Sequence, residues 1–143
     1  MNDTEGGVSP MIRGLVITHG DIGRELVRVT EMILGPVDGL TAMSNHGKSA
    51  TDITAEISAW LAEGREHPGG SAGNLILLDD YGGSCATSAQ LACGPDPGAA
   101  IVSGVNLAML LGFVTWRESG DFDELVSKVV RKGREAIILV GRR

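Results

Sequence analysis

The chain contains, at residues 14–26, the sequence GLVITHGDIGREL, in which a strand pattern changes to a helix pattern within a few residues. Its first four residues are apolar, as in a short buried strand. Ile22, Leu26 and Val29 then recur at helical spacing. We therefore expect His19 to lie in a turn that leads into a helix. Unpaired backbone N–H groups at the start of a helix favour an anion such as a phosphoryl group, which a histidine in this turn can receive.

The alternation of strand and helix patterns continues along the whole chain. Strands are predicted at residues 15–18, 40–43, 75–79, 100–103 and 136–140. Helices are predicted between them, at residues 22–34, 53–61, 84–92, 107–116 and 122–130. A loop is predicted at residues 63–74. This order predicts an α/β fold with a doubly wound, mostly parallel open sheet that is flanked by helices on both faces.

The composition is that of one domain with a core of its own. With 143 residues and 43% hydrophobic content, the chain can bury a core without disulfides or a structural metal. We expect a polar, disordered leader at residues 1–10 and a single domain at residues 11–143. The net charge of −6 argues against binding to nucleic acid.

Two cysteines and one uncharged stretch bear on the compartment. Cys85 and Cys93 are eight residues apart, roughly 12 Å along one helix, which is too far for a disulfide. We expect both to be reduced thiols in a cytoplasmic protein.

Residues 97–116 carry no charge and have the length of a membrane span. The turn and N-cap residues at 103–106 instead predict a strand followed by a helix, with no insertion into a membrane.

Three glycine-containing turns follow predicted strands, at residues 19–21, 79–84 and 104–106. In a doubly wound sheet, ligands bind at the carboxyl ends of the strands. If the first and third strands are neighbours, the Asp79 carboxylate can accept a hydrogen bond from one ring nitrogen of His19. The other ring nitrogen then keeps its lone pair to attack phosphorus. His19 and Asp79 are therefore the predicted catalytic residues.

Small and hydroxyl residues next to this pair are suited to hold the transferred group. Gly82 and Gly83 allow backbone amides to approach it, and Ser84, at a predicted helix start, can donate a hydrogen bond. We predict Gly20, Gly83 and Ser84 as phosphoryl-binding residues. No metal or other cofactor is predicted.

At these residues the chain resembles the mannose-type enzyme IIA domain of the bacterial phosphoenolpyruvate-dependent sugar phosphotransferase system. The resemblance extends from about residue 14 to the carboxyl end. Its motifs are Thr18-His19-Gly20, Glu31-Met32-Ile33-Leu34-Gly35, Leu78-Asp79, Gly82-Gly83-Ser84, Gly104-Val105-Asn106-Leu107 and Phe122-Asp123-Glu124-Leu125. The chain departs from the family at Cys85, where proline is usual, and at Ala108, which also replaces a proline.

The resemblance implies a function and an assembly. It implies that His19 accepts a phosphoryl group on Nε2 from the phosphohistidine of the carrier HPr, with Asp79 as its partner. The group then passes to a histidine of a IIB domain or protein, for sugar uptake and phosphorylation. The resemblance also implies a homodimer, in which the last strand, residues 136–140, is exchanged between subunits and lies antiparallel at the sheet edge. An exposed apolar edge strand would itself favour such pairing.

Two other functions remain open at this point. Phosphorylation of His19 can instead regulate binding to a partner that is not coupled to transport. Residues 42–49 imitate a P-loop, which would suit a nucleotide-binding protein.

Several side chains also have plain structural interpretations. Asp21 is expected to be a helix N-cap rather than a catalytic group, and Ser84 can cap a helix as well. His46 and His67 are expected to be solvated loop residues, and Cys85 is expected to be a small packed residue.

Overall fold

The computed structural model describes residues 10–118 and 121–142. The predicted leader, residues 1–10, therefore falls outside the described residues except for Pro10. The strands are β1 (Met11–Thr18), β2 (Leu40–Ser44), β3 (Ser71–Leu78) and β4 (Ala99–Ser103). The helices are α1 (Ile22–Leu34), α2 (Ala50–Glu66), α3 (Ser84–Cys93), α4 (Leu107–Trp116) and α5 (Phe122–Glu135).

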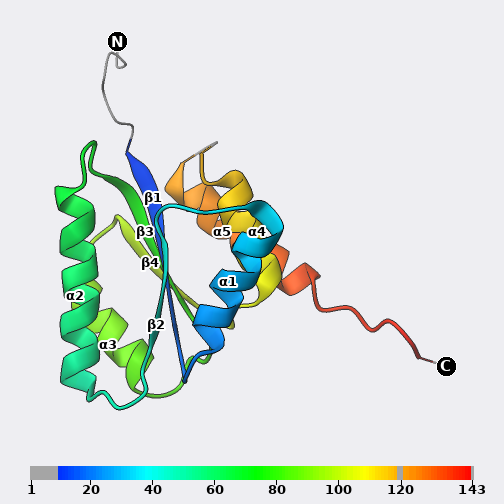
Figure 1. Ribbon diagram of the computed structural model, residues 1–143, viewed down its shortest axis with the longest axis horizontal. Helices are drawn as coiled ribbons and strands as arrows, with labels where there is room; N and C mark the ends of the chain where they lie inside the picture. The colour runs from blue at the N-terminus through cyan, green and yellow to red at the C-terminus, as the bar shows by residue number, and fades with distance from the viewer. Residues whose placement is uncertain (1–9, 119–120, 143) are drawn as a thin grey trace, which may run out of the picture.

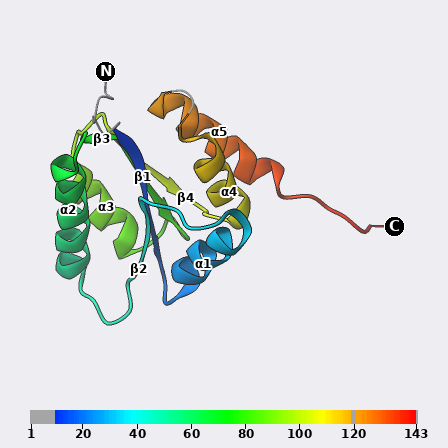
Figure 2. The same cartoon turned by 45° about the horizontal axis from the view of Figure 1, so that its top comes forward.

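The four described strands form one parallel sheet in the order β2-β1-β3-β4. Helices α2 and α3 cover one face of the sheet, and α1, α4 and α5 cover the other (Figures 1 and 2). This arrangement confirms the predicted doubly wound α/β fold. The connection after β1 runs along one face and the connection after β3 along the other, so the winding direction changes between these two neighbouring strands. Ligands bind at such a switch point in open α/β sheets.

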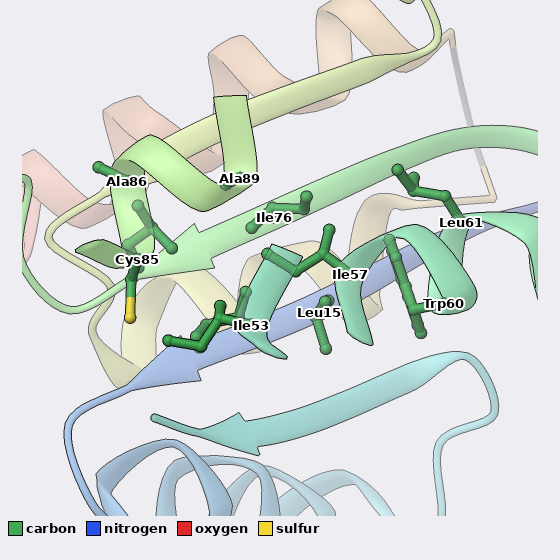
Figure 3. Packing of buried hydrophobic residues seen from close by; sticks show 11 residues of the cluster. Leu15, Ile53, Ile57, Trp60, Leu61, Ile76, Cys85, Ala86 and Ala89 are labelled. Atoms are coloured by element: carbon green, nitrogen blue, oxygen red, sulfur yellow. The ribbon is translucent and has the colours of Figure 1, made fainter. Parts of the chain in front are cut away.

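The core has two layers because side chains on a strand alternate between the two faces of the sheet. Leu15 of β1 and Ile76 of β3 point toward α2 and α3, where Ile53 and Ile57 pack over them (Figure 3). Val16 points to the opposite face and packs with the helices there. All five of these side chains are almost fully buried, so both faces of the central strands exclude water. The site that follows β1 and β3 is therefore built on rigid elements.

Strands β1 and β3 begin four residues earlier than their predicted starts at 15 and 75. The prediction missed the start of β1 because Arg13 is charged, yet the strand buries this residue. The Arg13 guanidinium stacks over the Trp60 ring, 4.1 Å from the ring centroid. Arg13 Nη1 also donates a hydrogen bond of 2.8 Å to the Trp60 carbonyl oxygen. Burial lowers the pKa of Arg13, against an opposing effect of Glu63. Helix α2 extends to Glu66, so the loop predicted at residues 63–74 is reduced to residues 67–70.

The uncharged stretch 97–116 divides into β4 and α4, as predicted. The Asn106 side chain caps α4, because its Oδ1 accepts a hydrogen bond of 3.0 Å from the Met109 backbone N–H. Within residues 10–118 and 121–142, no helix is long and apolar enough to cross a membrane.

The strand predicted at residues 136–140 is absent from the single chain, and this prediction is wrong for the isolated subunit. Helix α5 continues to Glu135, and the segment beyond it runs away from the body of the molecule (Figure 1). Its side chains are open to solvent, with Ile137 81% and Val140 90% exposed. A strand needs a hydrogen-bonding partner, and the segment does not turn back to an edge of its own sheet. The exchange of this segment between subunits stays a prediction.

Candidate functional site

His19 and Asp79 meet at the carboxyl ends of two neighbouring strands. The parallel register pairs Ile17 of β1 with Leu78 of β3, so the residues that follow these strands come together at the same edge. The backbone N–H of His19 donates a hydrogen bond of 3.0 Å to Oδ2 of Asp79. Nδ1 of the His19 ring lies 3.0 Å from the same oxygen. The predicted contact between this histidine and this acid is therefore present.

The two side chains differ in their exposure to solvent. The His19 side chain is 60% exposed, whereas that of Asp79 is 17% exposed. The hydrogen bond and the negative charge of Asp79 raise the pKa of His19, with a smaller contribution from the charge of Asp80. Burial alone would raise the pKa of Asp79, but hydrogen bonds from the backbone and ring of His19 outweigh it, so the pKa is lowered. An ionised Asp79 thus faces an accessible imidazole.

This contact defines the tautomer of the neutral imidazole. An ionised carboxylate only accepts hydrogen bonds, so the Nδ1 atom of His19 carries the proton that Asp79 Oδ2 accepts. The lone pair then lies on Nε2, which faces away from the carboxylate. The arrangement is that of an oriented nucleophile at the surface of the protein.

The turn that carries His19 is fixed by the last residue of β1. Thr18 is fully buried, and its Oγ1 accepts a hydrogen bond of 2.7 Å from the backbone N–H of Gly23 in the first turn of α1. Asp21 is the N-cap residue of α1, as predicted, although its side chain makes no capping hydrogen bond. Its carboxylate instead pairs with Arg24 at 3.0 Å. The hydroxyl of Thr18 therefore replaces a conventional cap.

The loop after β3 brings a second helix start to the same edge. The N-cap of α3 is Gly83, whose φ of +97° is in the region that favours glycine. Ser84 is the first residue of the helix rather than its cap, so its capping role is not realised. Gly20 also has a positive φ, of +59°. Gly83 and Ser84 are exposed, and Gly20 is half-buried.

Two further loops are tied to the site through backbone hydrogen bonds, which the sequence pattern did not indicate. The N–H of Val105 donates to the carbonyl oxygen of Leu78, at 2.9 Å, and attaches the loop after β4. The N–H of Asn45 donates to the carbonyl oxygen of Thr18, at 3.1 Å, and attaches the loop after β2. These contacts depend on chain geometry rather than on side chains, so no residue type marks them. Together they fix the ends of β1 and β3.

The P-loop-like stretch does not form a phosphate-binding loop. Its first three residues, 42–44, belong to β2, which leaves too little free backbone to surround a triphosphate. The ammonium group of Lys48 pairs with Glu56 at 2.9 Å. The geometry therefore disfavours the nucleotide-binding alternative.

The remaining candidates have structural roles. His46 is exposed, as predicted. His67, the C-cap residue of α2, is half-buried rather than solvated as expected. Cys85, in the first turn of α3, is 3% exposed and belongs to the core cluster between the sheet and helices α2 and α3. Burial raises the pKa of its thiol. The interpretation of Cys85 as a small packed residue is confirmed, and neither it nor Cys93 forms a disulfide.

Comparisons of the sequence place these features in a family. The model of the EIIA-man family, described as PTS system fructose IIA component, matches residues 14–130. The PTS system mannose-specific EIIAB component of Escherichia coli (strain K12) is 30% identical over 122 residues. The match covers 84% of this chain and 36% of that protein, so the chain spans about a third of the length of its curated relatives.

Solved structures of similar proteins have the same fold. The mannose/sorbose-specific IIA subunit from Enterococcus faecalis has a TM-score of 0.76 at 25% identity, over 95% of this chain and 98% of that one. The phosphotransferase system component EIIA from Streptococcus agalactiae has a TM-score of 0.79 at 23% identity. That match covers 90% of this chain and 96% of the other.

Proposed function

This chain belongs to the EIIA-man family of sugar phosphotransferase system IIA components, and on that basis we propose that it is a phosphohistidine carrier. His19 accepts a phosphoryl group from the phosphohistidine of HPr and passes it to a IIB domain or protein. The single observation that carries the proposal is the 3.0 Å contact of His19 Nδ1 with Asp79, which leaves the lone pair on Nε2 of a side chain that is 60% exposed.

The proposed transfer is an exchange of one N–P bond for another. The Nε2 lone pair of His19 attacks the phosphorus of the incoming phosphohistidine, and a new N–P bond forms. The N–P bond of the donor breaks, and its electron pair returns to the donor imidazole. Phosphorylation at Nε2 leaves the proton on Nδ1, so the hydrogen bond to Asp79 persists and keeps the ring in place. The second transfer, to the IIB histidine, repeats the same exchange with His19 as the donor.

Two helix starts support this chemistry. Helices α1 and α3 both begin at the edge of the sheet where His19 lies (Figure 1). Their first N–H groups have no partner within the helix, and the helix dipole places partial positive charge there. The oxygens of the moving phosphoryl group carry negative charge, so these positions stabilise the transfer. Gly20, Gly83 and Ser84 are the residues that we assign to this role.

Labelling of His19 tests the proposal. We expect radiolabel from phosphoenolpyruvate, supplied through enzyme I and HPr, to appear as an acid-labile adduct on His19. The variant His19→Ala should incorporate none. His46→Ala is the matched control, because it removes an exposed loop histidine and should label like the natural chain. Label that persists in His19→Ala would exclude this residue as the acceptor.

The identity of the acceptor distinguishes transport from regulation. In the transport role, the phosphorylated chain loses its label to a IIB protein. In the regulatory alternative, the label stays on His19 and changes the affinity for another protein. Pull-down of partners with the phosphorylated and unphosphorylated chain separates the two roles.

We also propose that the chain is a homodimer. The support is the apolar segment 136–140, which leaves the body of the subunit with its side chains in solvent. Such a segment can pair with the exposed edge of a sheet in another copy, where its backbone groups and apolar side chains are both covered.

A further inference from the structure

The charges of this chain are unevenly distributed along its length. Residues 128–143 contain six of the twelve lysines and arginines but only one of the eighteen acidic residues. The rest of the chain is therefore strongly acidic, whereas this end is basic. Four of the six cations lie on α5, namely Lys128, Arg131, Lys132 and Arg134. Such a separation of charge within one domain indicates a local surface that attracts anions.

Three of these cations line a cleft between α4 and α5, which we call the α4–α5 cleft. It has a volume of about 240 Å³ and is lined by Trp116, Lys128, Arg131, Lys132 and Glu135. The three cations are spaced three and four residues apart from Lys128, so they share one face of α5. Trp116, the last residue of α4, supplies the wall from the second helix. The cleft therefore brings three positive charges to one small volume.

These charges are not neutralised by acids of the same subunit. Among residues 10–118 and 121–142, no carboxylate lies within ion-pair distance of Lys128, Arg131 or Lys132. Both arginines of α1, in contrast, pair with acids one turn earlier. Glu135 follows Arg131 by four residues, but an acid that lies C-terminal to the base is the less favourable order for a helical pair. The like charges repel one another, and an anion in the cleft would relieve that repulsion.

The dipole of α5 accounts for only part of this cluster. The negative end of a helix dipole favours cations in the last turn, where α5 has Lys132 and Arg134. Lys128 lies two turns from the end, where the effect has faded. Its ammonium group instead lies over the Trp116 ring, 4.7 Å from the ring centroid. A cation–π contact fixes the position of an ammonium group without cancelling its charge. Lys128 is therefore held in place at the cleft.

The charges and the size of the cleft define the chemistry of an occupant. Three cations and Glu135 leave two net positive charges, which match a phosphate monoester with its charge of about −1.5 to −2. A carboxylate would neutralise only half of this charge. The guanidinium of Arg131 can donate two N–H bonds to phosphate oxygens, and the lysines add point charges. The volume is below the roughly 300–1,000 Å³ of pockets for drug-sized ligands, so only a phosphate group with a small substituent fits inside.

The α4–α5 cleft is separate from the other two sites of the subunit. Helix α4 begins at the edge of the sheet where His19 lies, and its ten residues place Trp116 about 15 Å further along the axis. Val130 and Arg134 line the surface next to β4. They are each two residues, about half a turn, beyond a lysine of the cleft. A segment paired with the β4 edge would thus lie on the other side of α5.

We propose that the α4–α5 cleft binds a phosphate group with about two negative charges, as a ligand site distinct from the phosphoryl group transferred at His19. The phosphate belongs either to a small soluble ester or to a lipid headgroup, because both present the same chemistry to the cleft. Its affinity falls as the salt concentration rises, since the attraction is between exposed charges.

The test uses one probe for each source of phosphate. Titration calorimetry of the unphosphorylated chain with inorganic pyrophosphate measures the soluble source. Flotation with phosphatidic acid vesicles measures the lipid source, and phosphatidylcholine vesicles are the blank. The double variant Lys128→Gln/Arg131→Gln removes two charges from the cleft. The matched control is Arg65→Gln/Arg134→Gln, because it removes the same charge from exposed residues that do not line the cleft.

We expect the natural chain to bind at least one of the two probes. The affinity should fall at least about tenfold in the cleft variant and remain nearly unchanged in the control. Binding of pyrophosphate alone indicates a soluble ester as the ligand, and binding of phosphatidic acid vesicles alone indicates a lipid headgroup. Circular dichroism verifies that both double variants are folded. Lys132→Gln changes a single exposed side chain and should weaken binding in the same direction.

Three outcomes would overturn the proposal. The first is that the natural chain binds neither probe, and the second is that both double variants weaken binding equally. The third is binding that survives in the cleft variant but is lost in Ser84→Ala, since the anion would then occupy the site beside His19. Because these measurements use the unphosphorylated chain, they do not depend on whether HPr labels His19.

Discussion

His19 Nδ1 and Asp79 Oδ2 lie 3.0 Å apart although the two residues are 60 positions apart in the chain. The contact exists because β1 and β3 are neighbouring parallel strands that end at the same edge of the sheet. The same carboxylate oxygen also accepts the backbone N–H of His19. One acid therefore fixes both the turn and the orientation of the imidazole ring.

Replacement of this acid should change both the rate and the pH dependence of phosphorylation. Only the neutral imidazole has a free lone pair on Nε2, so the rate should rise with pH as His19 loses a proton. Asp79 raises the pKa of His19, and Asp79→Asn should therefore shift the midpoint of the profile to lower pH. On the plateau the rate should fall about ten- to a hundredfold, as expected for loss of a hydrogen bond to a charged group worth about 1.5–3 kcal/mol.

Asp80→Asn provides the control for that measurement. Asp80 is exposed, and its charge makes the smallest of the contributions that raise the pKa of His19. Its replacement should move the midpoint in the same direction but by much less, and should leave the plateau rate unchanged. A pH–rate profile of phosphorylation from HPr measures both quantities. Equal shifts in the two variants would contradict the specific role of Asp79.

The buried hydroxyl of Thr18 should be required for the stability of the site. Thr18→Val keeps the shape of the side chain but leaves the N–H of Gly23 without its acceptor. We expect the free energy of unfolding to fall by about 1–3 kcal/mol, the cost of a buried unsatisfied donor. Thr18→Ser retains the hydroxyl and should lose less. Urea denaturation measures both variants, and equal losses would show that the methyl group matters more than the hydrogen bond.

The two glycines before α3 should respond differently to alanine. Gly83 has a φ of +97°, so Gly83→Ala strains the backbone whatever space is available, at a cost of roughly 1–3 kcal/mol. Gly82 has no positive φ, and a Cβ there meets only an Asp80 oxygen at 3.9 Å. Gly82→Ala should therefore be close to neutral. The midpoint temperature of thermal unfolding and the rate of His19 phosphorylation should both be lower in Gly83→Ala and unchanged in Gly82→Ala.

Removal of the apolar end of the chain should change the assembly without unfolding the subunit. Truncation after Ala136 removes four apolar residues, Ile137, Ile138, Leu139 and Val140, which are all at least 69% exposed. We expect the full chain to be a dimer at micromolar concentration and the chain truncated after Ala136 to be a monomer, as measured by light scattering. A full chain that is already monomeric would contradict the proposed strand exchange.

The sequence predicted elements well where the periodicity was uninterrupted. The bounds of α1 and α4 agree with the predicted ranges 22–34 and 107–116, because apolar residues recur at helical spacing between clear turn signals. β1 was predicted too short because Arg13 interrupts the apolar run, although stacking on Trp60 allows it to be buried. The residue type of Asp21 predicted an N-cap, but the hydrogen bond from the Gly23 N–H goes to the Thr18 hydroxyl and not to the Asp21 carboxylate. The burial of Arg13 and the capping of α1 thus both depend on a partner residue that the local pattern does not show.

By itself the sequence indicated which residues we propose to carry the chemistry, since a histidine after a buried strand and a Gly-Gly-Ser turn after another are local patterns. It also determined the α/β fold class, because the order of strand and helix periods restricts the topology. Only the tertiary structure decided that β1 and β3 are neighbours, and hence that Asp79 reaches His19. It also decided that segment 136–140 leaves the body of the subunit. The physical reason is that strand pairing and burial are properties of the whole packed chain, whereas local patterns record only what each segment favours.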